Sequence, residues 1–218
     1  MAKELIFYSG IYNSSVKSAV ESLQQIDKNE DVLVRLNSGG GEVTAGFSFL
    51  SVLSERTGEV NGIIDGQAAS MAAIWIMFFN NVEANDTSTI MFHKAAYPSW
   101  YSPTDDEKAS LDRTNKMFEK KVRAKVSGDT PEGKAFLDKL FEKDKRNDVE
   151  LTAHQAKKLG LISKVRTLKT SAYQGMQMVA MVEEGSEIVA KKSEPTQEVN
   201  KTSKSNKNSM EISQEKYD

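Results

Sequence analysis

Short apolar runs alternate with segments of helical periodicity in the first half of this chain, and this alternation limits its possible folds more than any other feature. Three runs closed by turn residues have the length of strands: Leu5–Tyr8, Asp31–Leu36 and Val60–Ile64. Two segments between them space their apolar residues for one helix face: Val16–Ile26 and Val43–Leu53. This order predicts βαβ crossovers and a mostly parallel sheet, which is an α/β fold.

The sheet is expected to continue beyond these elements. Asp65-Gly66 is expected to close the third strand, and the small, apolar Ala68–Met77 segment to form a buried helix. Further strand is expected around Glu83 and over Thr89–His93, and a final strand at Leu161–Ile162.

The second half carries three helix starts. Ser102 as N-cap with Pro103 at the first helical position predicts a helix to about Val126, and Thr130-Pro131 predicts another. Thr152–Gln155 is a capping box for a short helix that ends at Gly160. The first of these helices is mostly charged, with a sparse apolar stripe, so we expect it to project or to contact a partner. The stripe consists of Leu111, Phe118 and Val122.

Composition excludes several classes of site. The chain has no Cys and two His, which rules out disulfides, Cys-ligated metals and a thiol nucleophile and argues against a metal site. With 29 basic and 31 acidic residues, it offers no electrostatic case for nucleic acid. No export signal is apparent, and the longest apolar run, Met71–Phe79, is too short to cross a membrane. We expect a cytoplasmic protein that needs no cofactor.

The end of the chain differs in composition from the rest. From Glu183 onward there is no Leu, Phe or Trp, and such a segment cannot bury enough apolar surface to offset the cost of ordering. We therefore expect a folded domain over residues 1–168 and a tail over 169–218, disordered from about 183.

Ser70 is the first candidate for chemistry. It follows an expected strand and begins an apolar helix among small residues, so a substrate could approach it, and the helix N-terminus would favour a developing oxyanion. A small residue that eases a tight turn is the plainer interpretation. Asn37-Ser-Gly-Gly-Gly41 could likewise bring backbone N–H groups to a ligand, or be only a turn.

A serine nucleophile needs a base and a carboxylate that orients it. His93 ends an expected strand, where α/β sheets present catalytic groups, whereas His154 is expected on a solvated helix face. Asp144, Asp148 and Glu150 all precede the last helix, and composition does not choose among them.

Together these segments resemble the ClpP family of serine peptidases, from Leu5 to about Val165. Asn37–Gly46 resembles that family's Asn-Ser-Pro-Gly-Gly segment, and Gly66–Ala73 matches its nucleophile motif. Met91–Lys94 is similar to its Met-x-His motif, and Asp148–Ala156 to its Asp-x-x-Leu-Ser/Thr-Ala segment.

The resemblance implies a spiral of ββα units, shared with crotonases, in which a handle region at about 97–145 projects. It implies a triad of Ser70, His93 and Asp148, with the backbone N–H groups of Gly40 and Met71 as the oxyanion hole. It also implies a homo-oligomer whose heptameric rings stack through the handle around a closed chamber, with polypeptides as substrates.

Three departures from the family pattern stand out. Gly39 replaces the family's proline, and Ser163 replaces the usual Asp after Gly-Leu-Ile. The chain begins almost directly at its first expected strand, which leaves the axial loops that engage an ATPase unfoldase without a counterpart and such a partner in question. Compact chains of this kind resemble phage-type members associated with head maturation, whose partners are capsid or scaffold proteins.

Two other functions remain open. A crotonase-like acyl-CoA enzyme would share the core and the oxyanion hole but would not need the Ser–His–Asp set. A catalytically silent ring or assembly protein would keep the fold and fail to react at Ser70.

Overall fold

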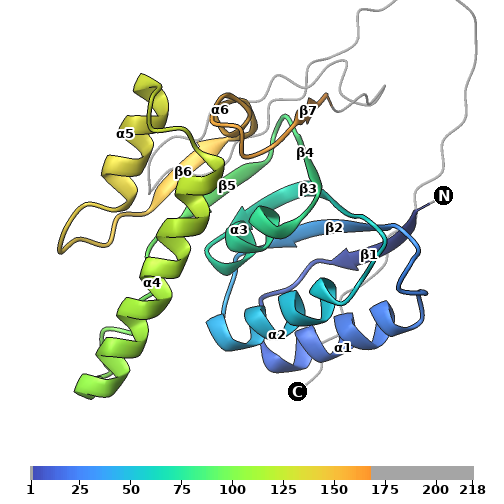
Figure 1. The fold of residues 1–218 in the computed structure, drawn as a ribbon, viewed down its shortest axis with the longest axis horizontal. Helices are drawn as coiled ribbons and strands as arrows, with labels where there is room; N and C mark the ends of the chain where they lie inside the picture. The colour runs from blue at the N-terminus through green and yellow to red at the C-terminus, as the bar shows by residue number, and fades with distance from the viewer. Residues whose placement is uncertain (1, 168–218) are drawn as a thin grey trace, which may run out of the picture. The chain divides into compact units, whose positions relative to one another are not determined.

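The computed structural model describes residues 2–167, and the tail expected over 169–218 lies outside them. The described residues form a mixed α/β unit whose seven strands make one sheet in the order β1-β2-β3-β4-β7, with β5 paired to β3 and β6 paired to β5 (Figure 1). The predicted α/β class, with a mostly parallel sheet, is confirmed.

The first half of the unit follows the expected alternation. Its elements are β1 (Lys3–Phe7), α1 (Asn13–Gln24), β2 (Val32–Ser38), α2 (Val43–Ser54) and β3 (Val60–Ala69). β1, β2 and β3 pair in parallel, and α1 and α2 lie side by side against one face of the sheet (Figure 1). The apolar runs are strands because parallel strands are buried, and the amphipathic segments are helices because only one face of each is covered.

β3 is longer than the sequence suggested, and the turn expected at Asp65-Gly66 is wrong. The strand first pairs with β4 (Asn81–Asn85), then continues so that Gln67–Ala69 pair with β5 (Thr89–Phe92). The following helix therefore begins later than expected, as α3 (Met71–Trp75) and the short 3-10 helix η1 (Ile76–Phe78). Pairing with β5, which the local sequence does not reveal, extends β3 past Gly66.

The second half adds three helices and two more strands of the sheet. It contains α4 (Asp105–Lys125), α5 (Pro131–Leu140), β6 (Val149–Thr152), α6 (Ala153–Lys158) and β7 (Lys164–Arg166). β6 runs antiparallel to β5, and β7 runs parallel to β4. The final strand thus starts two residues beyond the expected Leu161–Ile162, which are buried core residues instead.

Capping explains where these helices start. Thr130 and Thr152 are the N-caps of α5 and α6, as the sequence predicted. The N-cap of α4 is Thr104 rather than the expected Ser102, because the Thr104 hydroxyl accepts from the Glu107 N–H while the Glu107 carboxylate accepts from the Thr104 N–H.

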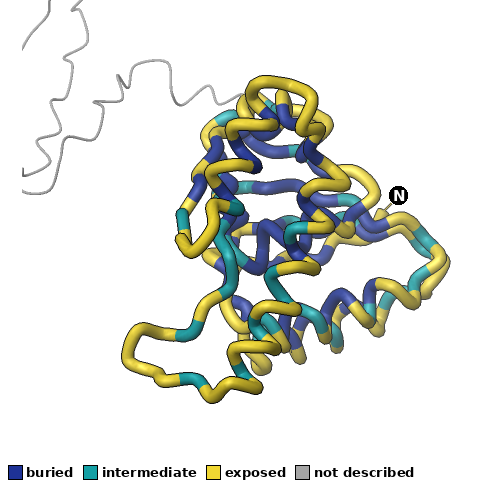
Figure 2. Tube along the Cα trace, turned by 60° about the vertical axis from the view of Figure 1, so that its left-hand side comes forward, coloured by how far each residue is buried: buried dark blue, intermediate teal, exposed yellow. Residues whose placement is uncertain are grey.

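Two of the three stripe residues of α4 are buried within the chain itself. Phe118 is 6% exposed and Val122 1% exposed, and the Phe118 ring lies 6.0 Å from that of Phe47. The expectation that they form a contact with a partner is therefore wrong, because other parts of the same chain, among them Phe47 of α2, already cover them. Buried residues lie mainly along the strands and the inward turns of helices, as the tube in Figure 2 shows.

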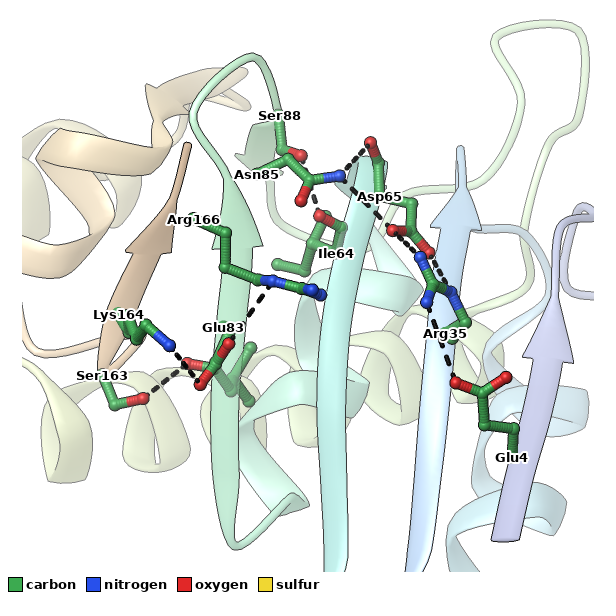
Figure 3. Close-up of polar contacts among 11 residues, drawn as sticks. Glu4, Arg35, Ile64, Asp65, Glu83, Asn85, Ser88, Ser163, Lys164 and Arg166 are labelled. Carbon is green, nitrogen blue, oxygen red and sulfur yellow. Dashed lines mark hydrogen bonds and ion pairs between the residues drawn. The ribbon is translucent and has the colours of Figure 1, made fainter. Parts of the chain in front are cut away.

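The face of the sheet opposite α1 and α2 carries linked polar side chains (Figure 3). Arg35 of β2 donates to both carboxylate oxygens of Asp65 on β3, at 2.9 and 2.6 Å, and the Asn85 amide donates to Asp65 as well. On the other side of this face, Glu83 pairs with Lys164 and Arg166 of β7. Charged pairs across neighbouring strands let this face meet water, which parallel sheets seldom do. No helix within residues 2–167 is long and apolar enough to cross a bilayer.

Candidate active site

Ser70 stands directly after the extended end of β3, in a backbone conformation that serine rarely adopts. Its φ is 56° and its ψ is −120°, and its N–H donates to the carbonyl of Met91 at 2.8 Å. The bond to β5 holds this conformation, which costs an L-residue about 1–2 kcal/mol. Strain of this kind persists where the surrounding structure imposes it, and it often marks a functional position.

The glycine loop after β2 lies against Ser70. Gly40 has a φ of 86°, and a Cβ built there would stand 2.5 Å from the Ala69 carbonyl oxygen and 2.7 Å from the Ser70 Cβ. Hydrogen bonds to Ile11 hold the loop, since Ile11 N–H donates to the Gly40 carbonyl and Glu42 N–H donates to the Ile11 carbonyl, both at 2.8 Å. Glycine is required at position 40 because the two backbones are in contact there.

The two expected oxyanion donors border the same place. The same added Cβ at Gly40 would be 3.0 Å from the backbone nitrogen of Met71. The Gly40 N–H itself donates to the Ser38 hydroxyl at 3.2 Å, so this donor is occupied in the structure. Gly39 has open space around it, with the nearest atom 3.9 Å from a built Cβ, so a larger residue at this position would meet no close neighbour.

The pairing of β5 with β3 brings His93 to Ser70. Ala69 pairs with Met91 in parallel register, so Ser70 and His93 both follow the ends of neighbouring strands. The His93 Nδ1 lies 2.6 Å from the Lys94 carbonyl oxygen and 3.3 Å from Arg146 Nε. One nitrogen cannot both donate to a carbonyl and accept from a guanidinium. The shorter contact assigns the proton to Nδ1, which leaves Nε2 free to act as a base.

The antiparallel pairing of β5 with β6 brings one of the three acidic residues toward the end of β5. Phe92 pairs with Val149, so the next step of the register sets His93 opposite Asp148, while Glu150 pairs with Met91. The carboxylate of Asp148 is nevertheless 60% exposed, and the partner recorded for it is Arg146, at 3.7 Å. His93 and Asp148 thus stand next to the paired ends of β5 and β6, and the Arg146 side chain contacts both.

Ser70 and His93 line one cavity of about 70 Å³ between the sheet and α4. The other lining residues are small or apolar: Gly41, Val43, Met71, Ile74, Ala95, Ala96 and Phe118. Such a cavity suits a small, uncharged group beside a hydroxyl and an imidazole. His154 is exposed on α6, which confirms the solvated position expected for it. Within residues 2–167 no three His, Asp or Glu side chains are grouped so that they could hold a metal ion.

The sequence did not point to three residues beside this site: Val43, Asn115 and Arg146. Asn115 bonds the segment after His93, and Arg146 contacts the ring itself. For Asn115 a signal existed, because it lies three and seven residues before Phe118 and Val122 and so shares their buried face of α4. For Arg146 there was none, since charged residues surround it in the chain.

A strained serine and an imidazole with a free nitrogen share one small cavity, and the backbone nitrogen of Met71 lies beside the serine. A nucleophile, a base and nearby backbone N–H groups are parts that acyl transfer to serine uses. The model of one protein family, Clp protease, matches residues 3–169. The matched range includes every residue of the cavity. The chain therefore belongs to the Clp protease family of serine peptidases.

Proposed function

We propose that this protein is an endopeptidase that cleaves polypeptides through Ser70, His93 and Asp148. The observation that carries the proposal is the shared cavity in which strained Ser70 meets His93, because neither a turn nor a core histidine requires that arrangement. Family membership supports a serine mechanism, and the residues of the site supply the groups for it.

The proposed reaction follows from the roles that these groups can take. His93 Nε2 removes the proton of the Ser70 hydroxyl as its oxygen attacks the scissile carbonyl, and the resulting oxyanion is bound by the N–H groups of Gly40 and Met71. His93 then gives the proton to the leaving amine. Water, activated by the same nitrogen, releases the acyl group from Ser70. Gly40 can donate to the oxyanion once its bond to Ser38 is given up.

Asp148 is the proposed acid of the triad, and the pairing of Phe92 with Val149 at the end of β5 supports this choice. To accept from His93 Nδ1–H, which the Lys94 carbonyl holds in this structure, Asp148 must exchange Arg146 for His93 and share that proton with the Lys94 carbonyl. The Arg146–Asp148 pair is exposed on both sides, and such pairs contribute about 0–1 kcal/mol, so this rearrangement costs little. We infer that contact with a neighbouring subunit favours it.

We also propose that the protein works as a homo-oligomer of stacked rings whose chamber encloses the sites. Several large apolar side chains are exposed in the handle region, and among them Trp100 is 82% exposed, which is unusual for a protomer that acts alone. Capsid or scaffold proteins as substrates, and an ATPase unfoldase as a partner, are narrower proposals that depend on this assembly.

Labelling with a fluorophosphonate followed by site mapping tests the proposal directly. We expect one label, on Ser70, and hydrolysis of short peptides that Ser70→Ala abolishes while the circular dichroism spectrum is unchanged. His93→Ala should be about as damaging, since nucleophile and base act as a unit. Asp148→Asn should lose less activity, and His154→Ala, on the exposed helix, serves as the silent control.

Two outcomes would favour the other functions. Turnover of an acyl-CoA thioester without peptide hydrolysis would indicate a crotonase-like enzyme. A folded oligomer that neither hydrolyses peptides nor reacts at Ser70 would indicate a silent ring or assembly protein.

A further inference from the structure

The segment that follows His93 is held by one side chain of α4. The Ala95 N–H donates to Asn115 Oδ1 at 2.7 Å, and Asn115 Nδ2 donates to the Ala95 carbonyl at 3.0 Å. The amide of Asn115 thus pairs with the backbone as a neighbouring strand would. Asn115 and Ala95 are both half-buried, and Ala95 lines the cavity that contains Ser70.

One of these bonds is linked to the catalytic imidazole through a single peptide group. The carbonyl of Lys94, which accepts from His93 Nδ1 at 2.6 Å, and the N–H of Ala95 belong to the same peptide unit. This unit is planar and rigid, with its N–H and C=O pointing in opposite directions. When Asn115 Oδ1 holds the N–H, it therefore also sets the direction in which the carbonyl faces the ring.

This segment has a second anchor. Lys94 Nζ donates to the carbonyl of Glu142 at 2.8 Å, in a bond that is exposed to water. An exposed bond can exchange with water, whereas both bonds of the Asn115 amide are partly buried and go to one residue. The orientation of the Lys94–Ala95 peptide unit thus depends mainly on Asn115.

We propose that Asn115 is a positioning residue that keeps His93 in its catalytic tautomer and orientation through the Lys94–Ala95 peptide unit. The inference rests on the proposed peptidase function. With Nδ1–H bonded to the Lys94 carbonyl, Nε2 is the nitrogen left to take the Ser70 proton. Asn115 acts on the base without touching substrate, and it does so from a helix that the triad residues do not belong to.

The test compares peptide hydrolysis by Asn115→Ala and Asn115→Asp. Asp keeps the oxygen that accepts from the Ala95 N–H, but replaces the donor to the Ala95 carbonyl with a second oxygen and adds a negative charge. We expect kcat to fall about tenfold to a hundredfold in Asn115→Ala, as for small misplacements of a catalytic group, with KM changed less than about threefold. Asn115→Asp should recover most of kcat, and the rate of fluorophosphonate labelling at Ser70 should follow kcat.

The matched control is Asn80→Ala. The Asn80 side chain accepts from the Val60 N–H at 2.8 Å, at the end of β3 farthest from Ser70, so its removal costs a similar bond without reaching His93. It should lower the melting temperature to a similar degree and leave kcat unchanged. If Asn115→Ala does not fold, Asn115→Leu, which nearly preserves the side-chain shape, replaces it in the same comparison.

The outcomes separate the two proposals. A wild-type protein that neither hydrolyses peptides nor is labelled at Ser70 would overturn the proposed function. An active wild type whose kcat is unaffected by loss of the Asn115 amide would overturn the positioning role alone. Equal losses in Asn115→Ala and Asn115→Asp would do the same, because only the Ala95 N–H bond is retained in the second. So would a gain in kcat, since the amide would then be blocking the site.

Discussion

At the scale of single residues, the site depends on two backbone positions that touch. Gly40 and Ser70 both have positive φ, and a Cβ at one would collide with the other. Neither conformation is favourable by itself for an ordinary residue. A hydrogen bond to Ile11 holds the conformation of Gly40, and a hydrogen bond to Met91 holds that of Ser70.

Gly40→Ala and Gly39→Ala form a matched pair. The change at Gly40 should destabilise the fold by at least about 1–2 kcal/mol through its φ alone, with crowding against Ala69 and Ser70 in addition, and should abolish hydrolysis. The change at Gly39, where the space is open, should be neutral or stabilise by up to about 1 kcal/mol if its backbone suits alanine. Urea unfolding and peptide hydrolysis measure both effects. A tolerated alanine at position 40 would contradict the close approach of the loop.

The strained backbone at Ser70 predicts an unusual order of stability for two variants, Ser70→Gly and Ser70→Ala. At an ordinary position alanine is more stable than glycine by about 0.5–1 kcal/mol. At φ 56° the order should reverse, so that Ser70→Gly unfolds at a higher urea concentration than Ser70→Ala, while both are inactive. If Ser70→Ala proved the more stable of the two, the strained conformation would be wrong.

At the scale of elements, α4 joins an exposed N-terminus to the surroundings of the cavity. Thr104 and Glu107 cap its exposed first turn, whereas farther along the helix Phe118 lines the cavity and Asn115 bonds to Ala95. The helix therefore transmits the stability of its exposed end to the segment that carries His93.

The capping box of Thr104 and Glu107 at the start of α4 predicts that the stability of the fold depends on pH. Hydrogen bonds from the Tyr101 hydroxyl and the Thr104 N–H hold the pKa of Glu107 below its ordinary value of 4.5. A carboxylate whose pKa is lowered by folding stabilises the fold above its unfolded pKa, and this contribution is lost as the pH falls through the folded value. The stability difference between wild type and Glu107→Gln should thus be constant near neutral pH and shrink below about 4.5.

Urea unfolding at a series of pH values measures this difference. Thr104→Ala serves as the reference, because loss of an N-cap should cost about 1 kcal/mol even at neutral pH. A difference between wild type and Glu107→Gln that grows on acidification would have the wrong sign for this cap.

At the scale of the whole molecule, Trp100 is the residue to test for assembly. It is 82% exposed and stacks edge-on beside Tyr101, so its removal should leave the protomer intact. Trp100→Ser should shift the sizing profile to smaller species and lower peptidase activity, with Ser99→Ala in the same loop as control. Phe118→Asp, by contrast, should unfold the protomer, because it places an unpaired charge in the core.

The size of the wild-type protein in solution tests whether it assembles into the proposed chamber. The chamber predicts a species many times larger than the 24.2 kDa chain. A wild type that stays monomeric at micromolar concentration and still cleaves peptides would rule the chamber out, and an unchanged profile for Trp100→Ser would remove that residue from the interface.

Local patterns by themselves determined much of this protein. The alternation of strands and helices, the capping threonines at 130 and 152, and the motifs around Ser70 and His93 are all readable from neighbouring residues. They are readable because periodicity, caps and turns depend on interactions within a few positions along the chain.

Only the tertiary structure decided how these parts meet. β3 runs past Gly66 because β5 replaces β4 as its partner, and that exchange sets Ser70 beside His93. The bond from Ala95 to Asn115 and the contact of Arg146 with His93 likewise join residues 20 and 53 positions apart. Strand register and side-chain partners are chosen by the packing of remote segments, so no local pattern encodes them.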